Sequence, residues 1–155
     1  MSVNDSPTTI GAFFTAVASR LQTQLSVAAN RIFVVDRLRL IDPNVPNFQI
    51  EPVSMNIMAD ETGTNAFYLD FRVHAVVKSE YDYSSKPTQK LVRATADKGA
   101  FQLATDVASA LNKHEATGAS NIIIMSLVNG GVDQTTGLSH ATATFRTMLR
   151  VFADG

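Results

Sequence analysis

The chain of 155 residues contains no cysteine. This absence excludes disulfide frameworks, thiolate nucleophiles and thiolate metal sites, and it favours folding in a reducing cytoplasm. Charged residues are also scarce, at 17% of the chain, so we expect part of the surface to contact something other than water. The 13 basic and 14 acidic residues nearly balance, which argues against nonspecific binding to nucleic acid.

Long apolar runs are missing as well. The first ten residues, MSVNDSPTTI, lack the basic start and apolar core of a signal peptide, and no apolar run approaches the roughly 20 residues that a membrane span needs. We therefore expect no membrane partner. The length and the 45% hydrophobic content predict one globular domain, residues 1–155, with a real core.

Motifs for catalysis and phosphate binding are not found. The chain has no Gly-rich phosphate loop, no dinucleotide fingerprint and no nucleophile elbow. The adjacent glycines of NGGV, residues 129–132, fall between two expected strands, which favours a hairpin turn. His74, His114 and His140 are too scattered for a recognisable metal site. We therefore predict that the protein is not an enzyme and has no catalytic residue, cofactor or metal.

Apolar residues that recur at three- and four-residue steps predict two helices. The first covers residues 7–28 and begins at Ser6 and Pro7, because serine can cap free amides and proline needs no hydrogen-bond partner at the first helical position. The second covers residues 94–113 and ends before Gly118. Both helices have one apolar side, so each is expected to pack against another layer.

The remaining periodic segments alternate with a period of two and predict five strands. Pro52 lies where the alternation changes phase, so we expect a β-bulge or an edge position there. The segment 129–139 is expected to be the long loop of a hairpin. The strands are predicted at residues 31–41, 48–58, 67–78, 121–128 and 140–152.

The order of elements is α-β-β-β-α-β-β. Consecutive strands with short connections favour antiparallel pairing, and two amphipathic helices can cover one face of such a sheet. We therefore predict an α+β fold with a mainly antiparallel sheet of about five strands and two helices packed on one face.

The third strand predicts which of its side chains face the core. Its odd-numbered positions from Phe67 to Val77 are apolar, whereas Asp70, Arg72 and His74 share the opposite side. These three polar residues have two interpretations. They could form an acid/base cluster, since neighbouring charges shift the pKa of a histidine, or they could make cross-strand pairs on a solvated or subunit-facing sheet. The second interpretation is favoured.

Further contact residues are predicted in the segment 79–93, which has no sustained period. A long loop in a small domain is more often functional than idle, and tyrosines beside charged groups are typical of protein interfaces. The alternative is that both tyrosine rings fold back over the edge of the core. The candidates in this loop are Glu80, Tyr81, Asp82, Tyr83 and Lys86.

Arginines form two further pairs with strand spacing. Arg37 and Arg39 are expected on one strand face, and Arg146 and Arg150 on another. Such pairs could meet acidic loops of a neighbouring subunit, or they could keep a strand edge from aggregating. Arg146 and Arg150 complete the set of predicted interface residues.

The chain resembles the tail terminator or tail completion proteins of tailed bacteriophages, the group that includes the phage lambda minor tail protein U. The resemblance covers most of the chain and is one of architecture rather than of an invariant signature. The segments that carry it are TTIGAFFTAVASRLQTQL, NAFYLDFRVHAVVKS with the irregular loop after it, KGAFQLATDVASALNK and the closing hairpin. The segment DPNVPNFQIEPVSM departs from the family pattern, which affects any subunit packing inferred there.

The resemblance implies a protein that assembles with itself as a ring, typically a hexamer, at the head-proximal end of the tail tube. There it would stop tube polymerisation and present a surface to the head. The implied partners are the tail tube protein, the head-tail connector protein and, in a contractile tail, the sheath, with no specific nucleic-acid sequence. The implied location is the tail or neck of the virion, after assembly in the host bacterial cytoplasm.

Two other classes of protein remain open. A tail tube subunit or head-tail connector would share this composition and element order. A small enzyme or ligand-binding domain would need a concave pocket near Asp70, Arg72 and His74.

Overall fold

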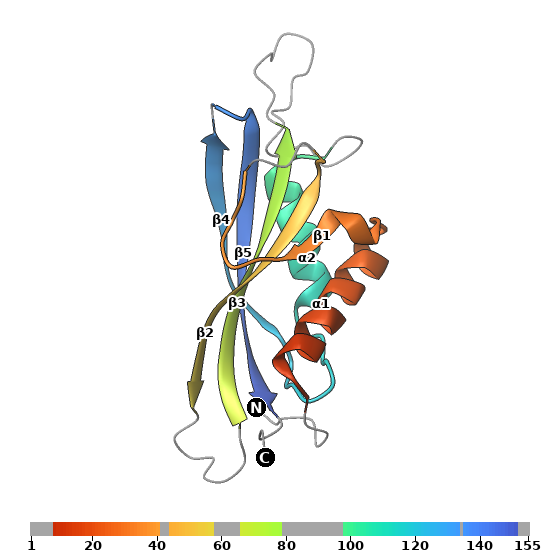
Figure 1. Ribbon diagram of the computed structural model, residues 1–155, viewed down its shortest axis with the longest axis vertical. Helices are drawn as coiled ribbons and strands as arrows, with labels where there is room; N and C mark the ends of the chain where they lie inside the picture. The colour runs from red at the N-terminus through yellow and green to blue at the C-terminus, as the bar shows by residue number, and fades with distance from the viewer. Residues whose placement is uncertain (1–7, 41–43, 58–65, 79–97, 134, 152–155) are drawn as a thin grey trace.

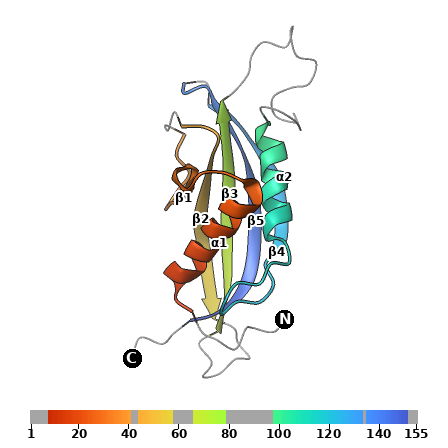
Figure 2. The same ribbon diagram turned by 90° about the vertical axis from the view of Figure 1, so that its right-hand side faces the viewer.

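The computed structural model describes residues 8–40, 44–57, 66–78, 98–133 and 135–151. It contains two α-helices, a short 3₁₀ helix and five strands joined in one sheet, in the order α-β-β-β-α-β-β (Figure 1). Both α-helices pack on the same face of the sheet, side by side (Figure 2). The predicted α+β class, strand number and layer arrangement are confirmed.

Helix α1 (Ile10–Leu25) begins at Thr9, whose hydroxyl accepts a hydrogen bond from the amide of Ala12 at 3.1 Å. It ends at Ser26, which adopts the left-handed conformation typical of a helix end. The helix is therefore shorter than the predicted 7–28, and the expected start signal at Ser6 and Pro7 lies outside the described residues. The apolar stripe of α1 is buried as predicted, with Phe13, Phe14, Val17 and Leu21 facing the sheet.

The sheet has the strand order β1-β2-β3-β5-β4. The pairs β2–β3, β3–β5 and β5–β4 are antiparallel, whereas β1 runs parallel to β2, an exception to the otherwise antiparallel sheet. The bounds of the strands are Ile32–Val34 for β1, Asn47–Ile57 for β2, Ala66–Lys78 for β3, Ile123–Asp133 for β4 and Leu138–Arg150 for β5. The second helix, α2 (Ala100–Leu111), covers the β5 and β4 half of the sheet.

Aromatic side chains form the centre of the core between sheet and helices. Phe71 of β3 stacks on its register partner Phe145 of β5, with ring centroids 5.3 Å apart. Phe13 and Phe14 of α1 meet the ring of Phe71 edge-on, at 5.8 and 5.7 Å. Edge-to-face and offset stacked rings are the favoured aromatic geometries. The predicted facing of β3 is confirmed, because Leu69, Phe71, Val73, Ala75 and Val77 are all buried.

Strands β1 and β4 differ in length from the predictions, whereas the irregularity expected in β2 is present. Strand β1 stops at Val34, so the predicted strand 31–41 is wrong after that residue, and Arg37 and Arg39 do not lie on a strand face. Strand β4 continues to Asp133 and includes Gly130 and Gly131, so the predicted hairpin loop at 129–139 is shorter. The expected irregularity at Pro52 is confirmed, since the β2–β3 register shifts between Pro52 and Ser54.

Candidate interaction surface

The face of the sheet that carries no helix is the candidate functional surface, called the open face here. Strand register defines it, because residues directly opposite one another in neighbouring strands point to the same side. Asp70 lies opposite Ser54 and Arg146, and His74 lies opposite Gln49 and Thr142. The open face includes Gln49, Glu51, Ser54, Tyr68, Asp70, Arg72, His74, His140, Thr142, Thr144, Arg146 and Met148, with Ile123, Ser126 and Val128 of β4.

Asp70 and Arg146 form the strongest ion pair on the open face. The Nε and Nη2 groups of Arg146 donate to the two carboxylate oxygens of Asp70, at 2.7 and 3.0 Å, which is a bidentate arrangement. The hydrogen bond from Arg146 lowers the pKa of Asp70 below its usual value. The guanidinium of Arg146 also lies 5.6 Å from the ring centre of Tyr68. Both charges of this predicted interface pair are therefore matched within the chain.

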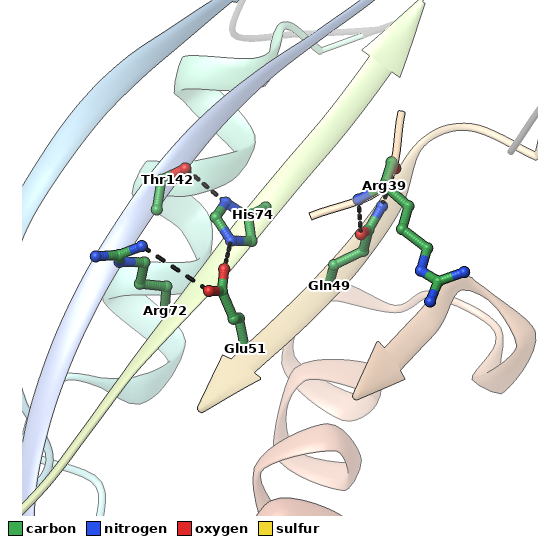
Figure 3. A network of polar contacts seen from close by, with 6 residues as sticks. All are labelled: Arg39, Gln49, Glu51, Arg72, His74 and Thr142. Carbon is green, nitrogen blue, oxygen red and sulfur yellow. Dashed lines mark hydrogen bonds and ion pairs between the residues drawn. The ribbon is translucent and has the colours of Figure 1, made fainter. Parts of the chain in front are cut away.

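His74 forms a second polar cluster, with Glu51 of β2 and Thr142 of β5 (Figure 3). Its Nε2 lies 2.7 Å from a carboxylate oxygen of Glu51, and its Nδ1 lies 2.7 Å from the hydroxyl of Thr142. The side chain is buried, at 5% exposure, and burial lowers its pKa. A neutral imidazole satisfies both contacts if Nε2–H donates to the carboxylate and the hydroxyl of Thr142 donates to Nδ1. Arg72 extends the cluster, 3.9 Å from the second oxygen of Glu51.

His140 lies next to this cluster in a confined position. Its ring centroid is 6.1 Å from that of His74, and its Nδ1 is buried without a hydrogen-bond partner among the described residues. Burial and the neighbouring His74 both lower the pKa of His140. Gly130 of β4 lies against the ring, because a Cβ at that position would overlap Nε2. Burial therefore disfavours the charged form of both histidines within the open face.

The chain segment after β1 covers one part of the open face. Its residue Arg39 donates its backbone N–H to the side-chain oxygen of Gln49 at 2.8 Å, and the Gln49 amide donates back to the Arg39 carbonyl at 2.7 Å (Figure 3). Gln49 also donates to the side chain of Asn47, and both residues are buried. The side chain of Arg39 points to solvent and pairs with Asp36 at 3.5 Å.

The structure brings together four of the predicted interface residues, Asp70, Arg72, His74 and Arg146. Cross-strand pairing, the favoured interpretation of the first three, describes their contacts. Arg150 shares the face of Arg146, as predicted, but lies apart from the four, at the end of β5 and opposite Ala66. The other candidates, Glu80, Tyr81, Asp82, Tyr83 and Lys86, lie outside the described residues.

Glu51 is a central residue of the open face that sequence reasoning missed. It accepts a hydrogen bond from His74 and lies near Arg72, yet it precedes His74 by 23 residues in the sequence. Only the β2–β3 register places it beside them, because Glu51 lies directly opposite Arg72. Strand alternation places Glu51 on the face opposite Ile50, but alternation alone does not say which residues of other strands lie beside it.

The described residues also bear on other kinds of site. No three metal-ligating side chains gather in the part of the chain that the structure describes. A hollow of about 410 Å³ lies between the end of α1, α2 and β2, lined by Leu25, Phe48 and Leu103 among others, with the Lys98–Asp106 ion pair in its wall. Asp70, Arg72 and His74 do not line it. Neither described helix is long and apolar enough to span a membrane.

Comparison with known proteins finds a similar fold but no related sequence. No family model matches this sequence, and neither does any curated protein. Among solved structures, 26 chains match. One of them belongs to a structure described as the virion of a native gene transfer agent particle, with a TM-score of 0.56 and 11% sequence identity. The match covers 90% of this chain and 96% of the other, so the two share a fold over nearly their whole length.

Proposed function

We propose that this protein is a structural component of a phage-like virion. The observation that carries the proposal is the similarity to a chain of the gene transfer agent particle, which extends over 90% of this chain and nearly all of the other. A shared whole-domain fold supports a shared type of role more than a local match would, although fold alone does not fix function. The hollow between α1, α2 and β2 does not include His74, so it gives no support to an acid/base site at His74.

Within this class, we propose the role of a tail terminator. The chain forms a homo-oligomeric ring, with a hexamer as the expected form, at the head-proximal end of the tail tube. It stops tube growth there and joins the tail to the head. Its partners are the tail tube protein and the head-tail connector, with the sheath added in a contractile tail. The resemblance of the element order and the closing hairpin to this family supports the assignment.

The open face and the segment 79–93 supply the contact residues in this proposal. Asp70 and Arg146 satisfy each other, and His74 is buried, so these residues would shape the surface rather than attract a partner. Arg72 differs from them, because its ion pair with Glu51 is long, at 3.9 Å, and its side chain is 44% exposed. It is the open-face charge best placed to meet an acidic group of a neighbour.

The role is tested by electron microscopy of particles made when this gene carries an early stop codon. Overlong tails of variable length, separated from filled heads, are expected if the protein terminates the tube. Tails of normal length that lack heads would replace the terminator role with that of a connector. Absence of tails would indicate a tube subunit, and unchanged particles would contradict a structural role altogether.

The contact role of Arg72 is tested by the substitution Arg72→Gln. It removes one partly exposed positive charge, and we expect at least a tenfold loss of ring assembly or tail attachment with little change in unfolding. Lys113→Gln, on the exposed turn after α2, is a matched control that removes the same charge elsewhere. Equal assembly of the two variants would remove Arg72 from the interface.

A further inference from the structure

The outer edge of β4 is covered over only part of its length. Near its start, the amide of Ile124 donates to the side chain of Asn112 at 3.3 Å. Just before the strand, the amide of Lys113 donates to the carbonyl of Ile122, and the amide of Ile122 donates to the carbonyl of His114. From Met125 to Asp133, no other described strand pairs with this side of β4. We call residues 125–133 the β4 edge.

The β4 edge has the composition of a contact surface. Met125, Val128 and Val132 are 55%, 54% and 51% exposed, and Asp133 at the end is the only charged residue. Natural edge strands are usually protected by lysine, proline or an inward-pointing charge. The β4 edge has none of these, although its bulges after Ile124 and Asn129 bend it locally. Its regular part between the bulges therefore offers unpaired backbone groups and apolar side chains together.

The opposite edge of the sheet, at β1 and β2, is also free over part of its length. Strand β1 pairs with β2 only from Phe48 to Ile50, so from Glu51 onward the outer side of β2 has no strand partner among the described residues. We call residues 51–57 the β2 edge. Val53 in its bulge is 42% exposed, and the carboxylate of Glu51 is directed to His74 and Arg72. The β2 edge therefore mixes apolar residues with Ser54 and Asn56 and has no free charge, and Pro52 at its bulge lacks the N–H that strand pairing uses.

The two free edges lie diagonally across the sheet. Asp133 is level with Leu138 and Lys78, at one end of the strands, whereas Ile57 is level with Phe67 and Leu149 at the other (Figure 1). A closed array of tilted strands requires such a stagger between its first and last strands. Two different edges on one chain also permit head-to-tail contacts, which close into a ring when the rotation between subunits allows it.

We propose that the β4 edge of one copy pairs with the β2 edge of the next copy, so that the sheet continues from subunit to subunit. This inference rests on the proposed ring and names its contact. A second copy is the occupant that the structure favours, because the same chain carries both free edges, and each has a single charged residue, Asp133 or Glu51, which is too few to recognise a charged partner. Main-chain hydrogen bonds would supply the affinity, as in other cases of strand addition.

The natural absence of cysteine makes a direct test possible. Val53→Cys and Val128→Cys variants, carrying tags of different size, are mixed and oxidised, both as concentrated purified protein and after assembly on tails. Disulfides join side chains only when their Cβ atoms are about 4 Å apart, so Met125→Cys and Val132→Cys are included to sample the register. We expect a disulfide between the Val53→Cys variant and at least one β4 variant, and a ladder of multimers from a chain that carries both substitutions. In the control, the Val53→Cys variant is mixed with a Ser109→Cys variant, whose cysteine lies on α2 and away from the β4 edge.

Three outcomes would overturn the inference. Disulfides between two copies of the same β4 variant, without any to Val53→Cys, would indicate two-fold pairing of β4 with itself. Disulfides only to another virion protein would assign the β4 edge to that protein. No disulfide above the Ser109→Cys control, in solution and on tails, would exclude the contact. Because the stop-codon experiment reads tail length instead, edge pairing and tail termination can fail independently.

A second variant tests the edge without disulfide chemistry. Val128→Lys adds a charge at an exposed position, so we expect the variant to have nearly the same unfolding temperature as the parent protein. The oligomer measured by light scattering, or the ring seen on tails, should fall at least tenfold. An unchanged oligomer in Val128→Lys, in a protein that remains folded, would contradict the role of the β4 edge.

Discussion

The two faces of strand β3 are stabilised in different ways by alternate residues of one segment. Toward the helices, Phe71 packs among three other phenylalanine rings. Toward the open face, Asp70 and His74 each find polar partners on neighbouring strands. The difference shows that a sheet face without a helix layer need not carry free charge: here the charges are largely paired within the chain.

Removing the central ring from the helix-covered face should have the largest effect. Phe71→Ala deletes a fully buried side chain and leaves a cavity among Phe13, Phe14 and Phe145. We expect the free energy of unfolding to fall by about 3–5 kcal/mol. Denaturant unfolding followed by circular dichroism measures the change. A loss below about 1 kcal/mol would mean that this aromatic cluster is not the centre of the core.

On the open face, the largest effect is expected at Glu51. Glu51→Ala leaves Nε2–H of His74 buried without its acceptor, which should lower the free energy of unfolding by about 1–3 kcal/mol. Glu51→Gln is the matched control, because its amide oxygen can still accept the hydrogen bond, and it should cost less. Equal losses for the two variants in chemical denaturation would show that the hydrogen bond contributes little.

Gly130 tests how tightly the open face is packed. Gly130→Ala should force the ring of His140 to move, at a cost of about 1–3 kcal/mol, because the added carbon would overlap the ring. Replacing His140 by alanine in the same chain removes the obstacle, so most of that cost should disappear in the double variant. A double-mutant cycle by thermal unfolding measures this coupling. If the effects of Gly130→Ala and His140→Ala on stability are additive, residues 130 and 140 are not in contact.

The pH dependence of stability should give the smallest effect and arises on the open face. His74 and His140 both have folded-state pKa values below the usual value near 6.5, so the unfolded chain binds their protons more readily. Stability is therefore complete above about pH 7 and decreases as the pH falls below 6.5, by at most about 1.4 kcal/mol per pH unit for each histidine. Glu51 and Arg72 face His74 and act in opposite directions on its charge.

Unfolding midpoints in denaturant between pH 7.5 and 5 measure this dependence. A His140→Gln variant cannot take up the second proton, so its midpoint should fall less steeply than that of the parent protein. Parallel curves for the two proteins would contradict the pH contribution assigned to His140.

Local patterns predicted the elements and facing of this fold well. The spacing of Phe13, Val17 and Leu21 gives the buried side of α1, and alternation gives both faces of β3. The position of Pro52 in a strand gave the bulge, because proline cannot donate to the strand ladder. These signals are local, since each depends on residues a few positions apart.

The strand ends and the open-face partners could not be predicted in this way. Gly130 and Gly131 resembled a turn, yet they lie inside β4, where Gly131 has a positive φ of 90° next to a bulge and its amide donates to Asn129. Strand β1 stops early because the chain then crosses to Gln49, a contact between side chain and backbone that periodicity does not encode. The pairing of Glu51 with His74 depends on register, which joins distant segments.

The bridge between Thr8 and Val151 has a practical consequence for imaging. The amide of Thr8 donates to the carbonyl of Arg150 at 2.9 Å, so the first and last described residues are neighbours at one pole, opposite the turn between β4 and β5. A small fluorescent or gold-binding tag fused at either terminus would therefore mark that same pole. Averaged images of tagged particles would then reveal the polarity of the subunit along the tail axis.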